Sequence, residues 1–174
     1  KYDVITLHRP ENLDDPKKFH KLILDFEKIG KKFNTKFLFP VHPRTKKIIN
    51  KLNIKKLNFI KITKPLEFLD FLTTMKNSKI IFTDSGGIQE ESSLLGVPCI
   101  TIRTTTERQL SIINKTNILT GYDYNKILKA VIYFNNISMK PSTVFGDGNV
   151  SNRIFNMIKK FEIKLNKSFT KNLN

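Results

Sequence analysis

Two adjacent glycines, Gly86 and Gly87, stand where the chain is expected to turn from a buried strand into a helix. The apolar run 80–82 precedes them, and a helical pattern of apolar residues continues after them. Glycines in the first turn of a helix leave backbone N–H groups open to a ligand, and these groups carry the positive end of the helix dipole. The turn therefore favours a phosphate or diphosphate. The alternative is a ligand-free connection in which Ser85 caps the helix.

The residues after the glycines carry two carboxylates and an amide into the first helical turns, from Gln89, Glu90 and Glu91. Negative charge suits the N-terminus of a helix but would crowd a bound phosphate. At least one of these side chains should therefore face another group. A pair of sugar hydroxyls is a good candidate, because carboxylates accept hydrogen bonds from hydroxyls.

Side chains that can bind or catalyse also follow three other expected strands. These segments are 8–12 (His-Arg-Pro-Glu-Asn), 41–44 (Val-His-Pro-Arg) and 103–108 (Arg-Thr-Thr-Thr-Glu-Arg). The carboxyl ends of parallel strands lie at one edge of a sheet, where ligands collect in α/β proteins. A single histidine or arginine in a loop is ordinarily an exposed residue without a function. Several of them at the same edge of the sheet favour a binding site along that edge, here called the rim.

The elements that must position this rim follow from the hydrophobic pattern, which alternates between short apolar runs and amphipathic segments. Strands are predicted at 4–7, 36–40, 59–62, 79–83, 99–102 and 117–119. Helices are predicted at 16–32, 44–51, 65–76, 87–95, 106–114, 124–135 and 149–167, the first capped by Asp14 or Asp15. Strands that alternate with helices form parallel sheets through right-handed crossovers. We therefore expect a Rossmann-like α/β fold with helices on both faces of the sheet.

Composition limits the class of protein further. The chain has 174 residues, of which 39% are hydrophobic, enough for one well-buried domain. The single cysteine, Cys99, excludes a disulfide or zinc framework and is expected to be a small buried residue. No segment has the length of a membrane span or the pattern of a signal peptide, which favours a cytoplasmic location. Because the sequence starts at Lys1 and soon enters a strand, we expect a piece of a longer protein.

The net charge of +16 would suit a polyanion such as nucleic acid. However, the lysines occur singly or in pairs along expected helix faces, without a basic arm or interleaved aromatic residues. A solvated basic surface is the preferred interpretation, and nucleic acid is not a predicted partner. A nucleotide-binding or RNA-binding module without catalysis remains an alternative.

Six stretches, in order along nearly the whole chain, together resemble the UDP-N-acetylglucosamine 2-epimerase family. They are 6–12 (Thr-Leu-His-Arg-Pro-Glu-Asn), 40–45 (Pro-Val-His-Pro-Arg-Thr), 83–91 (Thr-Asp-Ser-Gly-Gly-Ile-Gln-Glu-Glu), 96–98 (Gly-Val-Pro), 103–108 and 146–148 (Gly-Asp-Gly). The resemblance implies a GT-B type fold of two Rossmann-like domains with the active site between them. Residues 1–174 would be the C-terminal, nucleotide-binding domain, and the helix at 149–167 would cross toward an N-terminal domain that this chain lacks.

The resemblance also implies roles for individual residues. The segment 85–87 would bind the diphosphate of UDP, with Arg108 as an additional forked donor. Glu91 would accept hydrogen bonds from the ribose hydroxyls. Phe71 would pack against uracil, although its spacing beside Phe68 and Leu72 would equally suit a core position.

A histidine, His8, matches a catalytic position near the charge that develops on the departing diphosphate. Arg9 and His42 would be further cleft residues, and His42 falls where bacterial relatives place an effector nucleotide. Pro43 with Arg44 departs from the pattern of the allosterically regulated members. Gln109 stands where many members have proline, which should alter the start of a helix rather than the chemistry.

The implied reaction is the interconversion of UDP-GlcNAc and UDP-ManNAc by a non-hydrolysing enzyme. UDP leaves the anomeric carbon while the C2 proton is lost, and UDP then adds again with the proton returned on the opposite face. The acid and base carboxylates would come from the absent N-terminal half, and no metal or cofactor is expected. A hydrolysing enzyme that releases N-acetylmannosamine and UDP is an alternative, as is an enzyme for a modified uronic acid sugar nucleotide. Relatives are commonly dimers, so a homodimer of the full-length protein is expected.

Overall fold

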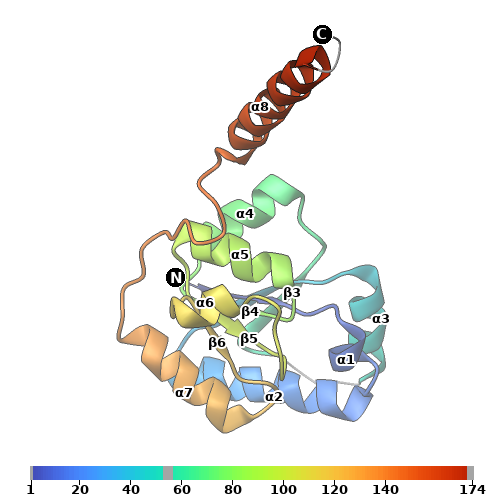
Figure 1. Cartoon of the computed structure of the whole chain (residues 1–174). Helices are drawn as coiled ribbons and strands as arrows, with labels where there is room; N and C mark the ends of the chain where they lie inside the picture. The colour runs from blue at the N-terminus through green and yellow to red at the C-terminus, as the bar shows by residue number, and fades with distance from the viewer. Residues whose placement is uncertain (1, 53–56, 172–174) are drawn as a thin grey trace.

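A six-stranded parallel sheet forms the centre of the computed structural model, which describes residues 2–52 and 57–171 (Figure 1). The strands are β1 (Tyr2–Thr6), β2 (Lys36–Pro40), β3 (Ile60–Thr63), β4 (Ile81–Thr83), β5 (Cys99–Thr101) and β6 (Asn117–Leu119). The helices are α1 (Pro10–Leu13), α2 (Pro16–Phe33), α3 (Pro43–Lys51), α4 (Phe68–Lys76), α5 (Gly86–Leu95), α6 (Gln109–Ile113), α7 (Tyr124–Asn135) and α8 (Val150–Lys171). This architecture confirms the Rossmann-like α/β fold expected from the sequence.

The strand order is β3-β2-β1-β4-β5-β6, so the direction of winding reverses between β1 and β4. These two strands pair in parallel, with Val4 opposite Ile81 and Thr6 opposite Thr83. The register places the loop that follows β1 beside the loop that follows β4. In doubly wound sheets this reversal is where a ligand binds beyond the carboxyl ends of the strands.

Alternate strand residues fill two hydrophobic layers, one on each face of the sheet. Ile5 and Phe82 point to the layer shared with α2, α3 and α7, whereas Val4 and Ile81 point to the layer shared with α4 and α5. Figure 1 shows α2 and α7 on one side of the sheet and α4 and α5 on the other. Burial on both faces explains why the strands read as continuous apolar runs rather than as alternating ones.

Helix α2 is fixed against the larger layer by its caps and by a close approach at Gly30. Asp15 caps the helix, because its carboxylate accepts hydrogen bonds from the N–H groups of Lys17 and Lys18. The helix passes Gly30 and ends at Phe33, one residue beyond the predicted range 16–32. A Cβ at Gly30 would lie 2.5 Å from the Cβ of Phe59, so the glycine is required by packing, not as a stop.

Two predicted helices, α4 and α6, begin three residues later than expected, and one short helix was not predicted. Helix α4 begins at Phe68 instead of residue 65, because 65–67 is non-helical and Glu67 has extended dihedrals at the cap. Helix α6 begins at Gln109 instead of residue 106, because the hydroxyl of Thr106 accepts a hydrogen bond from the N–H of Arg108. The short helix α1 was not predicted and starts at Pro10, a residue preorganised for the first helical position.

Two further expectations concern Cys99 and the last helix. Cys99 is fully buried in β5, and burial raises the pKa of its thiol to about 12, which confirms a packing role. Helix α8 stands away from the rest of the domain (Figure 1). Its apolar residues are among the most exposed of the described chain, including Ile154, Phe155 and Phe161.

We expect Gly30→Ala to destabilise the protein by about 1–3 kcal/mol, because the added methyl group must displace Phe59. Urea unfolding would measure the loss as a lower midpoint. Gly87→Ala is the matched control, because a Cβ at Gly87 meets no atom within 4 Å and alanine suits a helix better than glycine. An unchanged midpoint for Gly30→Ala would contradict the close approach of α2 to Phe59.

Candidate functional site

A buried carboxylate, Asp84, joins the loop after β1 to the end of β4. Its oxygens accept hydrogen bonds from the backbone N–H groups of His8 and Arg9, both at 3.0 Å, and from Nδ2 of Asn12 at 2.7 Å. The imidazole of His8 is a further partner, with Nδ1 3.1 Å from Oδ1 of Asp84. Asp84 is fully buried, whereas the side chain of His8 is 51% exposed. Asp84 therefore presents His8 at the surface in one orientation.

The same contacts set the protonation of both partners. The hydrogen bond to Asp84 raises the pKa of His8 above its ordinary value and outweighs the burial that lowers it. Burial raises the pKa of Asp84, but the hydrogen bonds from His8, Arg9 and Asn12 together outweigh it and leave the pKa below its ordinary value. With a proton on Nδ1 held by the carboxylate, Nε2 is the nitrogen of His8 left for a ligand.

The glycine turn opens helix α5 directly after Asp84. Ser85 occupies the cap position with extended dihedrals, and its hydroxyl makes no capping hydrogen bond. Gly86 and Gly87 are the first two helical residues, and a Cβ at Gly87 would enter open space. Ser85 thus stands at the cap position that the ligand-free alternative assigned to it, but without the capping hydrogen bond. Both the hydroxyl and the first amides of α5 are thus left for a ligand.

Arg108 lies over the same turn. Its guanidinium carbon is 3.5 Å from the position that a Cβ on Gly86 would take. An ion pair with Glu90 engages the Nε of Arg108, and both side chains are about one-third exposed. The ion pair that Glu90 makes with Arg108 is therefore to Nε rather than to either of the two terminal nitrogens. Those two nitrogens form the fork that binds phosphate oxygens.

A pocket of about 380 Å³ lies on the other side of His8. Four segments line it: the ends of β1 and β2 with the residues that follow them, the segment after β3, and α4. The lining residues are Thr6, Leu7, His8, Pro40, His42, Pro65, Leu66 and Phe71. Phe71 is half-buried and also packs against the smaller hydrophobic layer, so it serves the core and the pocket together. The structure thus brings His8, His42 and Phe71 to one cavity.

Pocket, histidine and glycine turn form one continuous rim, because His8 lines the pocket and binds Asp84, which immediately precedes the turn. Arg9 joins the rim through its backbone N–H. Glu91 is half-buried on α5, beside the Arg108-bound Glu90, and is not among the residues that line the pocket. Burial, followed by the charge of Glu90, raises the pKa of Glu91.

Sequence reasoning included Asp84 in a motif but gave it no role, and it named Asn12 and Gln89 without identifying their buried partners. The signal for Asp84 was present, because a carboxylate between a buried strand and a glycine turn needs several donors to remain charged. Asn12 is 1% exposed and donates to Asp84 from within α1, the helix that was not predicted. Its burial could not be read from a segment interpreted as a loop.

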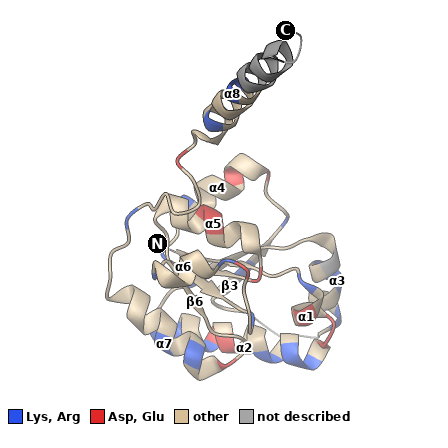
Figure 2. Cartoon of the chain, in the orientation of Figure 1, with Lys and Arg blue, Asp and Glu red and all other residues tan. Residues whose placement is uncertain are grey.

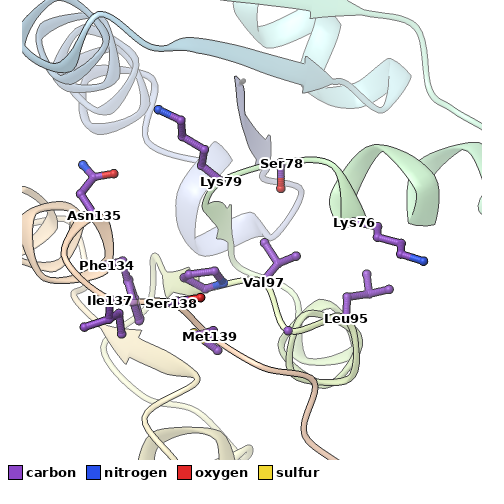
Figure 3. A pocket seen from close by; sticks show the side chains of 12 residues that line it. Lys76, Ser78, Lys79, Leu95, Val97, Phe134, Asn135, Ile137, Ser138 and Met139 are labelled. Carbon is purple, nitrogen blue, oxygen red and sulfur yellow. The ribbon is translucent and has the colours of Figure 1, made fainter.

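A second pocket, of about 440 Å³, lies at the opposite edge of the sheet, before β4 and β5 (Figure 3). Figure 3 shows Lys76 and Lys79 pointing away from one another around Val97. The second pocket is larger, but the residues that line it include no histidine or carboxylate. The pocket lined by side chains that can bind or catalyse is the one at the carboxyl ends of the strands, which includes His8 and His42.

Basic residues are dispersed over the molecule. Figure 2 shows Lys and Arg on α2, α3, α7 and α8 without a continuous stripe toward the rim. Within the residues that the structure describes, no group of three or more His, Cys, Asp or Glu side chains could hold a metal ion. None of the helices in that same part of the chain combines the length and apolar character of a membrane span.

The winding reversal and the glycine turn define a Rossmann-like α/β domain of the kind that binds nucleotides at its carboxyl edge. The chain belongs to the UDP-N-acetylglucosamine 2-epimerase family, since the family model of that description matches residues 1–159. The resemblance expected from the six sequence stretches is thereby confirmed.

Two curated relatives illustrate the range of the family. UDP-N-acetylglucosamine 2-epimerase of Methanococcus maripaludis is 41% identical over 162 residues, which cover 91% of this chain and 44% of the relative. UDP-2,3-diacetamido-2,3-dideoxy-D-glucuronate 2-epimerase of Pseudomonas aeruginosa is 29% identical over 157 residues, with 89% and 43% covered. The chain thus spans less than half the length of these relatives.

Solved structures agree with the fold. The UDP-GlcNAc 2-epimerase of Methanocaldococcus jannaschii, in complex with UDP-GlcNAc and UDP, superposes with a TM-score of 0.84 at 37% identity and covers 91% of this chain and 45% of that one. The Neisseria meningitidis enzyme bound to UDP-GlcNAc gives a TM-score of 0.79 at 30% identity, with 92% and 45% covered. The described domain has the fold of one half of these GT-B type enzymes.

We expect Asp84→Asn to lower the pKa of His8, because the hydrogen bond that raises this pKa loses its charged acceptor. An NMR titration of the imidazole resonances would show a lower midpoint than in the unmodified protein. His20, on α2, provides the internal reference. A His8 midpoint that stays in place or rises would contradict the pairing with Asp84.

Proposed function

We propose that this chain is the UDP-binding half of a UDP-N-acetylglucosamine 2-epimerase that interconverts UDP-GlcNAc and UDP-ManNAc without hydrolysis. The observation that carries the proposal is the joined rim, on which the Asp84–His8 pair lies between a pocket and an open glycine turn. Relatives that bear this name match nine-tenths of the chain, and two solved relatives were bound to UDP-GlcNAc.

The diphosphate of UDP lies on the turn at Ser85, Gly86 and Gly87. The first amides of α5 donate hydrogen bonds to it, and the terminal nitrogens of Arg108 neutralise it from the side. Uracil occupies the pocket beside Phe71. Glu91, whose raised pKa reflects burial near a second carboxylate, accepts hydrogen bonds from the ribose hydroxyls and gains donors that the free protein lacks.

Chemistry at the sugar begins with loss of UDP from the anomeric carbon. Negative charge grows on the diphosphate as this bond breaks, so donors fixed beforehand at the turn stabilise the transition state more than the ground state. His8 faces this charge through Nε2 as a proton donor or a charge-stabilising partner, and its raised pKa favours the protonated form. Arg9 and His42 extend the cleft beyond His8.

The remainder of the enzyme supplies the groups that move the C2 proton. The full-length protein adds an N-terminal Rossmann-like domain, and α8 crosses to that domain. The apolar residues exposed on α8, such as Phe155 and Phe161, support this docking because isolated apolar faces of helices are normally covered. We further propose that the full-length enzyme is a cytoplasmic homodimer.

Product analysis of the full-length enzyme separates the proposed reaction from its closest alternatives. Incubation with UDP-GlcNAc should yield a mixture of UDP-GlcNAc and UDP-ManNAc, with free UDP far below the amount of substrate converted. Release of one UDP for each N-acetylmannosamine would identify the hydrolysing enzyme instead. Turnover of a diacetamido uronate sugar nucleotide but not of UDP-GlcNAc would place the protein with its Pseudomonas relative.

We expect Gly87→Ala to weaken the binding of UDP by the full-length enzyme about tenfold or more, because the new Cβ occupies the open space through which the diphosphate approaches. Titration calorimetry would measure the affinity. Leu94→Ala changes an exposed position on the same helix and should retain the original affinity. Unchanged UDP binding by Gly87→Ala would show that the diphosphate does not bind at this turn.

A further inference from the structure

A buried polar network connects the first turn of α5 to the loop that carries Arg108. Its central member is Gln89, which is fully buried. Nε2 of Gln89 donates to the carbonyl of Ser85 at 3.2 Å. Oε1 of the same amide accepts from the hydroxyl of Thr106 at 2.7 Å and from Nδ2 of Asn117 at 3.0 Å.

Two hydroxyls hold the backbone of Arg108, one bonded directly to this amide and the other linked to it through Asn117. Its N–H donates to the Thr106 hydroxyl at 3.1 Å, and its carbonyl accepts from the Ser111 hydroxyl at 2.7 Å. The Ser111 hydroxyl in turn accepts from Nδ2 of Asn117 at 3.2 Å. Two separate routes therefore run from the backbone of Arg108 to Gln89.

The chemistry of the position requires an amide. A carboxylate would accept from Thr106 and Asn117 but could not donate to the carbonyl of Ser85 without binding a proton. An apolar side chain of similar size would leave three buried groups without their partner, each at a desolvation cost. Glutamine supplies a donor toward the turn and an acceptor toward the Arg108 loop in one rigid plane.

We propose that Gln89 is a positioning residue that sets the separation between the turn at Ser85 and the backbone of Arg108. The inference rests on the proposed function, in which both elements bind one diphosphate. Glu90, the next residue on α5, orients the guanidinium of Arg108 through Nε. Consecutive side chains of one helix thus fix the backbone and the side chain of the same arginine.

A double-mutant cycle on the full-length enzyme tests the inference, with the affinity for UDP measured by titration calorimetry. Gln89→Met should weaken binding about tenfold, the effect of losing one well-placed hydrogen bond to the ligand. In an Arg108→Ala background the same substitution should weaken binding less than about threefold, because there is no arginine left to misplace. Thr106→Val, which removes only the hydroxyl link, should reproduce both results if Gln89→Met fails to fold.

Ser93→Ala is the matched control, because it removes buried hydrogen bonds of the same helix, to the carbonyl of Gln89 and to Thr116, without severing either route to Arg108. It should retain the affinity for UDP. Equal losses from Gln89→Met in both backgrounds, or a comparable loss from Ser93→Ala, would overturn the positioning role. Absence of UDP binding by the unmodified enzyme would overturn the proposed function itself.

Discussion

The buried carboxylate of Asp84 is the interaction on which the rim depends. It is fully removed from solvent at the point where the winding of the sheet reverses, and it remains acidic because four donor groups surround it. Two of these donors are backbone amides of the loop after β1. A change in that loop would therefore leave a buried charge with fewer hydrogen-bond partners, which is energetically costly. The positions of the loop, of α1 and of His8 thus depend on a single side chain that directly follows β4.

The opposite edge of the sheet shows what happens when a buried carboxylate has fewer donors. Asp3 is 3% exposed and, among the described residues, accepts hydrogen bonds from Thr35 and from the N–H of Ile80. Burial prevails there and raises the pKa of Asp3 to about 6, whereas the pKa of Asp84 is lowered. The number and charge of the donors, rather than depth alone, decide the sign of the shift.

The sequence was sufficient to predict what depends on local pattern. The strands, the glycine turn and the alternation with helices each carry a periodic or positional signal, and their positions were found within a few residues. The roles of Asn12 and Gln89 were not predicted because they depend on partners 72 and 17 positions away along the chain, Asp84 and Thr106. A polar residue on a helix has the same sequence signal whether it faces solvent or a buried network, so only the tertiary structure separates the two.

The rim is built from loops, yet its geometry does not depend on the stiffness of loops. Each binding segment is tied to a neighbour by a buried polar side chain: the loop after β1 by Asp84, and the Arg108 loop by Gln89. Such networks are more rigid than their separate hydrogen bonds, because every member is costly to leave unpaired in a low dielectric. In the proposed reaction a diphosphate leaves and returns, which requires donors that keep their places in between, because electrostatic stabilisation is greatest where no reorganisation is needed. Buried amides and carboxylates behind the binding surface meet this requirement, while the exposed groups remain free to contact the ligand.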